Sequence, residues 1–155
     1  MLVWGLIQMK IARFLVNLGV LLSAGIAIPI SAIAQDWEPI NNPDELRQLL
    51  NGKGLDGEDF ADYYRADGAM GYFNKQYSTT VIRKWVVGEN GEICMYIFVK
   101  PDKLVSCQTV ERSAKDSNLI RLTISGRGYS VQARLTNNPL QDLVDAVAKT
   151  AGPSN

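Results

Sequence analysis

LIRLTISGRGYSVQARL, residues 119–135, alternates apolar and polar side chains on both sides of a glycine-containing turn. This two-residue period is typical of β-strands with one buried face. A turn at Gly126-Arg127 places Leu122 opposite Val131, and the pairs two residues further along in either direction are again apolar. Because a one-residue slip would move every apolar side chain to the solvent face, the pattern predicts an antiparallel hairpin in this register.

The segments before this hairpin follow the same pattern. Asp67-Gly68 and Asn90-Gly91 are strong hairpin signals, and β-branched and aromatic residues flank them. We expect about seven strands, at 60–64, 70–73, 79–87, 92–99, 103–112, 119–125 and 129–135. Hairpins in series predict a mainly β fold: an antiparallel meander forming a small barrel or a strongly curved sheet.

A helix is predicted at each end of the meander. Asn42 can cap a short helix that Pro43 opens, because Asn is a favoured N-cap residue and Pro suits the first helical position. Near the C-terminus, Asn138 can cap a second helix that opens at Pro139 and ends at Gly152. Its apolar residues recur at helical spacing, so this amphipathic helix is expected to pack on the sheet.

Two cysteines, Cys94 and Cys107, lie on neighbouring predicted strands. A hairpin turning around Lys100 and Pro101 would set them face to face, at a separation that a disulfide can span. We therefore predict a cross-strand disulfide, worth about 3 kcal/mol through chain entropy. The alternative, a redox-active or metal-binding pair, lacks the CxxC spacing.

Residues 1–34 read as a secretory signal peptide. Lys10 and Arg13 precede an uncharged apolar stretch that ends in Ala32-Ile33-Ala34, and small residues before the cut are what signal peptidase accepts. We expect cleavage after Ala34, leaving a single β-rich domain at 35–155 in the periplasm or outside the cell. The alternative is an uncleaved anchor, since about 20 apolar residues can span a bilayer. Membrane attachment is expected only through that uncleaved segment.

Composition excludes several functions. The chain has no histidine, which removes Ser-His-Asp and Cys-His catalysis and the commonest zinc ligand. Without residues 1–34 the chain carries 16 − 2 = 14 basic and 16 acidic residues, a net charge of −2. This balance gives no electrostatic reason to expect nucleic acid as a partner, and no cofactor is expected.

Aromatic side chains supply the candidate ligand site. If Trp85 faces Tyr96 and Arg83 faces Phe98 across a strand pair, these four residues line one wall of the barrel. The alternative is an ordinary core of aromatic cross-strand pairs.

Acidic residues supply a second, weaker candidate. Asp56, Glu58 and Asp59 could offer oxygen ligands to Ca²⁺, although their spacing is not that of an EF-hand. We favour a solvated loop over residues 52–59 and expect no metal there.

The segments 63–68 (YYRADG) and 91–94 (GEIC), with Trp85 and Cys107, resemble a group of small exported single-domain proteins of Gram-negative bacteria, which are largely uncharacterised. The resemblance implies a compact β-fold in the periplasm and lends no catalytic residue. In outline, the predicted order of helix, meander and helix also looks like lipocalin-type barrels, without their glycine-aromatic-tryptophan opening motif.

The expected function is therefore binding without catalysis. We expect an exported β-domain whose partner is an envelope protein or a small apolar ligand. Two alternatives remain open: a histidine-independent enzyme that uses carboxylates, and a purely structural envelope protein. A deep pocket would favour the ligand, an exposed aromatic patch the protein partner, and two buried carboxyls at a cleft the enzyme.

Overall fold

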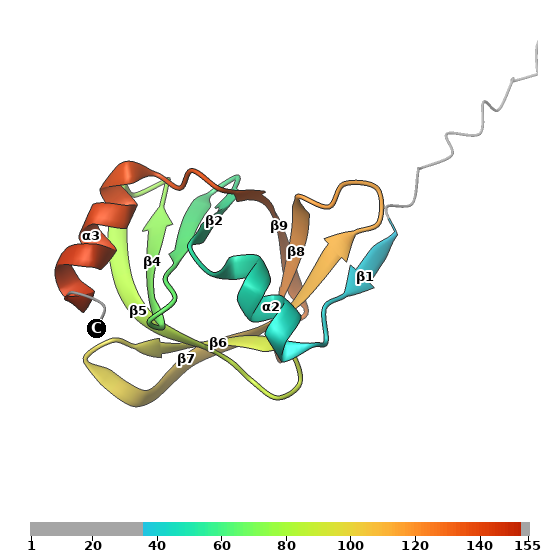
Figure 1. Ribbon diagram of the computed structural model, residues 1–155, viewed down its shortest axis with the longest axis horizontal. Coiled ribbons are helices and arrows are strands. Elements are labelled where there is room, and N and C mark those ends of the chain that lie inside the picture. The colour runs from blue at the N-terminus through green and yellow to red at the C-terminus, as the bar shows by residue number, and fades with distance from the viewer. Residues whose placement is uncertain (1–35, 153–155) are drawn as a thin grey trace, which may run out of the picture. The chain divides into compact units, whose positions relative to one another are not determined.

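The computed structural model describes residues 36–152, which form a β-barrel with two helices (Figure 1). The predicted signal peptide and its cleavage after Ala34 lie outside the described residues. In chain order the described elements are β1 (Trp37–Pro39), α2 (Pro43–Leu50), β2 (Lys53–Gly57), β3 (Phe60–Tyr64), β4 (Ala69–Asn74), β5 (Thr79–Val87), β6 (Glu92–Ile97), β7 (Lys100–Ser113), β8 (Leu119–Ile124), β9 (Tyr129–Thr136) and α3 (Gln141–Ala151).

Strands β2 to β9 form a closed ring. Each pairs antiparallel with the next strand along the chain, and β9 then returns to β2, where Leu135 lies opposite Leu55. A sheet whose first and last strands pair is a barrel, here with eight strands. β1 adds beside the end of β7, with Trp37 opposite Ser113. The predicted antiparallel meander with a helix near each end is confirmed, and it takes the barrel form rather than an open curved sheet.

The prediction of about seven strands missed β1 and β2. The expectation of a loop over residues 52–59 is wrong, because residues 53–57 form β2. That expectation followed from Gly54, Asp56 and Gly57, which are residue types depleted in strands. In the structure β2 pairs on both sides, with β3 and with β9, and its Leu55 is completely buried. Tertiary pairing here outweighs local propensity.

The register predicted for the last hairpin is confirmed. Leu122 lies opposite Val131, and Ile120 lies opposite Ala133. Ile120, Leu122 and Ala133 are at most 2% exposed, so this face of the hairpin belongs to the core. The alternation of the sequence therefore determines both the pairing and the buried face.

The register predicted between β5 and β6 is wrong by one residue. Trp85 lies opposite Met95 rather than Tyr96. The same shift moves Arg83 away from Phe98. Because successive side chains alternate between the two faces of a strand, Trp85 and Tyr96 point to opposite faces of the barrel wall.

The turn between these strands explains the shift. Gly88 N–H donates to Glu92 O (2.9 Å), and Gly91 N–H donates to Gly88 O (3.1 Å). The loop thus holds three residues, and Gly91 has φ 71°, as in a type I turn followed by a left-handed bulge residue. The prediction assumed a two-residue Asn90-Gly91 turn, which would pair the strands one position further along.

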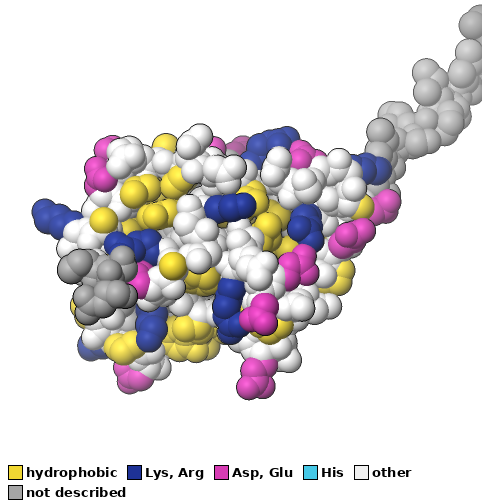
Figure 2. Space-filling view, in the orientation of Figure 1, with side chains coloured by type: hydrophobic (Ala, Val, Ile, Leu, Met, Phe, Trp, Pro, Cys, Tyr) yellow, Lys and Arg dark blue, Asp and Glu magenta, His cyan; other side chains and the backbone are white. Residues whose placement is uncertain are grey.

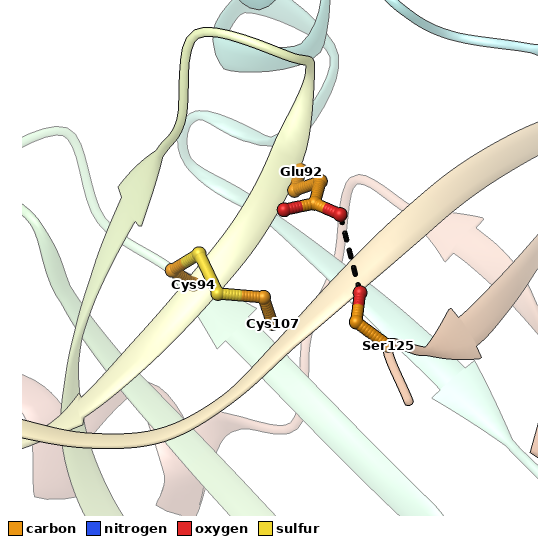
Figure 3. The surroundings of a disulfide bond; sticks show 4 residues. All are labelled: Glu92, Cys94, Cys107 and Ser125. Atoms are coloured by element: carbon orange, nitrogen blue, oxygen red, sulfur yellow. Dashed lines mark hydrogen bonds between the residues drawn. A yellow bond between two sulfur atoms is a disulfide. The ribbon is translucent and has the colours of Figure 1, made fainter. Parts of the chain in front are cut away.

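The predicted disulfide is confirmed between β6 and β7. Cys94 and Cys107 lie directly opposite each other, with their Cα atoms 4.0 Å apart (Figure 3). The predicted turn around Lys100 and Pro101 is wrong: Ile97 already pairs with Lys100, so the chain turns at residues 98–99. Pro101 lies instead beside a bulge in β7, where its missing N–H costs no ladder hydrogen bond.

The two helices begin differently from each other. Asn42 caps α2 as predicted, its Oδ1 accepting from Asp44 N–H (2.9 Å) and Glu45 N–H (3.2 Å). The predicted Asn138 cap of α3 is wrong, because that helix starts at Gln141 and Leu140 occupies its N-cap position without a side-chain hydrogen bond.

Helix α3 packs on the outer wall of the barrel, alongside β4 and β5 (Figure 1). A Cβ atom on Gly71 of β4 would lie 2.6 Å from side-chain atoms of Leu143 and Val147. Glycine at this position therefore lets the buried face of α3 approach the sheet, as the predicted amphipathic pattern requires.

Helix α2 fills one end of the barrel interior. It is surrounded by strands in Figure 1. Its Leu46 and Leu50 are completely buried, in one apolar cluster with Ile93 and Leu122 of the strands. This end of the interior is an ordinary packed core, so space for a ligand has to be sought elsewhere in the barrel.

Candidate functional site

A cavity of about 480 Å³ occupies the part of the interior that α2 does not fill. Small-molecule sites typically have volumes of about 300–1,000 Å³. Strands around the ring contribute to it, and the lining is mainly apolar with a few charged and amide groups. The lining residues are Glu58, Asp59, Phe60, Asp62, Tyr72, Arg83, Met95, Gln108, Leu122, Ile124, Tyr129, Ser130, Val131 and Gln132.

Strand alternation places the polar groups of the cavity. Phe60, Asp62 and Tyr64 are every second residue of β3, and all three are buried. Asp62 pairs with Tyr72 on β4, which brings the carboxyl and the ring to the same face. The same alternation on β5 turns Arg83 inward, on the face that carries Trp85.

Asp62 is the central acidic group. Its side chain is 5% exposed, and its Oδ2 accepts a hydrogen bond from the Tyr64 hydroxyl (3.0 Å). Burial raises the pKa of Asp62 to about 7, although the Tyr64 hydrogen bond and the Arg83 charge act in the opposite direction. Burial, reinforced by the Asp62 charge, also holds the pKa of Tyr64 well above its usual value, so Tyr64 stays a donor.

Arg83 is the basic group of the cavity. Its guanidinium lies over the Tyr72 ring, 5.0 Å from the centroid, which is within cation–π range. Its Nη1 donates to Met95 Sδ (3.6 Å), a weak acceptor. Within residues 36–152, no carboxylate oxygen lies within ion-pairing distance of this guanidinium.

Two polar atoms in the cavity wall lack a partner. They are Asp62 Oδ1 and Gln108 Oε1, and in the described part of the chain no other buried side-chain oxygen or nitrogen is unsatisfied. Native structures rarely leave such atoms unpaired, because desolvation costs about 1–3 kcal/mol each. Both residues line the same cavity, so its wall carries hydrogen-bonding groups that the protein itself leaves unpaired.

The four predicted ligand-lining residues are not brought together. Arg83 lines the cavity, but Tyr96 and Phe98 do not. Trp85 is buried in the core, edge-on to Tyr64 at 5.3 Å, and its Nε1 donates to Arg65 O (2.9 Å). Tyr96 is absent because the register shift between β5 and β6 puts it on the face opposite to Trp85, and Phe98 is absent because it lies in the turn at residues 98–99.

The residues that this prediction missed are Asp62, Tyr72 and Gln108. Alternation could have found one of them, since Asp62 lies two residues from both Phe60 and Tyr64, on their face.

The acidic residues of the weak calcium candidate do not converge. Asp56 forms an ion pair with Lys75 (2.7 Å), whereas Glu58 and Asp59 lie exposed at the cavity mouth. Among the described residues the one metal-compatible grouping is Glu92 with Cys94 and Cys107. The disulfide occupies both of those sulfurs, and Glu92 accepts from Ser125 Oγ at 3.2 Å (Figure 3).

A second pocket of about 390 Å³ lies elsewhere on the described chain, and neither of the two unsatisfied atoms belongs to its lining, which consists of Arg47, Asn51, Ala66, Asp67, Gly68, Lys84, Trp85, Val86 and Val87. Basic and acidic side chains are interspersed over the face shown in Figure 2, without the single-sign stripe that nucleic-acid binding uses. Neither helix within residues 36–152 has the length and apolar character needed to cross a bilayer. In comparisons with known proteins, no family model, no curated protein and no solved structure matches this chain. The function is therefore inferred from the cavity itself.

Proposed function

We propose that this protein is a non-enzymatic binding protein that holds a small, largely apolar molecule inside its barrel. The observation that carries the proposal is the coincidence of three features in one place. A cavity of ligand size, a mainly apolar lining and the unsatisfied atoms Asp62 Oδ1 and Gln108 Oε1 all lie within the barrel. Apolar walls with a few fixed polar groups are typical of ligand sites.

Catalysis is less well supported by the same residues. Hydrolysis by a carboxylate pair needs two carboxyls placed across a substrate. Asp62 is the one buried carboxyl of the described chain, and its hydrogen bond to Tyr64 ties one of its oxygens to the wall. A protein partner is favoured less than a ligand, because the polar groups without partners face inward rather than toward the surface.

We also propose that the protein works outside the cytoplasm. The Cys94–Cys107 disulfide supports this location, since such bonds persist in oxidising compartments. The predicted signal at 1–34 points to the same place. Export and signal cleavage are tested together by N-terminal sequencing of the protein recovered from the periplasm and the medium. A start at Gln35 is expected, and a chain retained with residues 1–34 intact would contradict it.

Ligand binding is tested with a neutral fluorescent probe, N-phenyl-1-naphthylamine. We expect a saturable rise in fluorescence that fits one site. Val131 lines the cavity, so Val131→Trp should fill it and weaken binding about tenfold or more. Thr109→Trp is the matched control, because Thr109 is an exposed strand residue outside the cavity lining. Loss of binding in both variants, or no saturable binding to the unmodified protein, would refute the proposal.

A further inference from the structure

We propose that the ligand is an organic anion: a small apolar molecule with one carboxylate, which lies against the Arg83 guanidinium. This inference rests on the proposed binding function and adds the chemical class of the ligand.

The ion pairs of the other arginines set Arg83 apart. Among the described residues, Arg65, Arg112 and Arg121 are partly buried as Arg83 is, and each of them pairs with a carboxylate. Arg127, which forms no ion pair within residues 36–152, lies exposed in a turn. A cation withdrawn from water without a counter-ion is unfavourable. The cavity beside Arg83 is where an anion could supply one.

The guanidinium is also positioned for this contact. A guanidinium has five N–H donors, and the single hydrogen bond that the described residues give it goes to the weak acceptor Met95 Sδ. The cation–π contact with Tyr72 holds the guanidinium against the wall. The remaining donors form a fork that matches the two oxygens of a carboxylate.

Asp62 is not the counter-ion of Arg83. Its carboxylate is not within ion-pairing distance of Arg83, and Tyr64 binds its Oδ2. The Arg83 charge lowers the pKa of Asp62, but burial outweighs it and raises that pKa to about 7, so Asp62 is a partly protonated neighbour of the guanidinium and not its ion-pair partner.

Acidic residues at the mouth of the cavity restrict the number of negative charges that the ligand can carry. Glu58 and Asp59 line it and are exposed. These carboxylates repel a second negative charge on the part of the ligand near the mouth. An apolar body with a single anionic end, inserted head first, fits this arrangement.

The test uses three molecules with one apolar body: 2-naphthoate, 2-naphthalenemethanol and 2-naphthylmethylammonium. Titration calorimetry measures each Kd. We expect naphthoate to bind about tenfold or more tightly than the alcohol, since a hydrogen bond between two charged groups is stronger than one that involves a neutral hydroxyl. The ammonium compound should bind most weakly. An unchanged Kd across the three head groups, or tightest binding of the ammonium compound, would overturn the inference.

Two variants distinguish a direct contact with Arg83 from a general effect of positive charge on binding. Arg83→Met keeps the apolar contact with Tyr72 and should weaken naphthoate to the level of the alcohol, while the alcohol itself changes little. Lys84→Met removes the same charge from the exposed outer face and should leave all three Kd values unchanged. Equal loss in both variants would contradict a specific contact.

Two further comparisons cover a variant that does not fold and separate failure of the anion inference from failure of the proposed function. If Arg83→Met fails to fold, Arg83→Lys replaces it: the charge remains, the fork is lost, and part of the preference for naphthoate should disappear. If the alcohol and the neutral probe bind and naphthoate binds no more tightly than the alcohol, the inference of an anionic ligand is overturned, but the proposed binding function is not. Failure of all four molecules to bind would overturn the proposed function itself.

Discussion

Replacing Asp62 by asparagine should change how the stability of the barrel depends on pH. Asp62 is buried, and its pKa rises from 3.8 to about 7 on folding. Between these values the folded protein holds a proton that the unfolded chain releases. Stability contributed by this group is therefore complete below about pH 4 and is lost as the pH rises toward 7. Asparagine at this position cannot ionise, so the variant should lack this loss.

The size of the effect follows from the pKa difference. One pKa unit corresponds to about 1.4 kcal/mol, so a difference of about 3 gives about 4 kcal/mol. The amide oxygen of the introduced asparagine could still accept the hydrogen bond that Tyr64 donates to Asp62. We therefore expect Asp62→Asn to match the unmodified protein at pH 4 and to exceed its free energy of unfolding by up to about 4 kcal/mol at pH 8.

Urea unfolding at pH 4, 5, 6, 7 and 8 measures this difference. Subtracting the two proteins at each pH cancels the surface carboxylates that titrate in both. Asp59→Asn is the control, because it makes the same chemical change at an exposed residue of the cavity mouth. A difference for Asp62→Asn that is constant from pH 4 to pH 8 would refute the reasoning.

Two more predictions concern the disulfide and the helix caps. Replacing Cys94 and Cys107, which are 13 residues apart, by alanine should lower the free energy of unfolding by about 3 kcal/mol. Urea unfolding of the oxidised protein against the double variant measures this, and a loss under about 1 kcal/mol would show that chain entropy is not the main term. Asn42→Ala should cost about 1 kcal/mol through the lost cap of α2, whereas Asn138→Ala, which removes no cap, should cost under about 0.5 kcal/mol. Equal melting temperatures for the two asparagine variants would contradict this assignment.

Local sequence predicts this fold where one face of a strand is strictly apolar. In β8 and β9 the wrong register would expose Leu122 and Val131 together, so the sequence leaves one choice. Between β5 and β6 both faces carry large side chains, and the register depends on whether the turn has two residues or three. Gly88 and Gly91 decide that question through backbone geometry that composition does not show.

The candidate site was harder to predict than the fold. Arg83 was identified, but with the wrong neighbours, because the site depends on the register of β5. Asp62 fell within the strand predicted at 60–64 but was not singled out, since the burial that distinguishes it arises when β2 and β4 pair on either side of β3. Gln108 carries no sequence signal at all. Its amide oxygen becomes a buried, unpaired acceptor only when the strands of the barrel pack around it.

Closure of the barrel also has a consequence for the order in which the chain folds. Gly54 lies opposite Thr136, and these residues are 136 − 54 = 82 positions apart in the chain. The strands between them can form successive hairpins as the chain emerges, but β2 keeps an open edge until β9 arrives. Ring completion is therefore a late, long-range step, and barrels of this kind fold slowly for that reason. Until then, the walls of the binding cavity are surfaces of an incomplete sheet, exposed to whatever lies nearby.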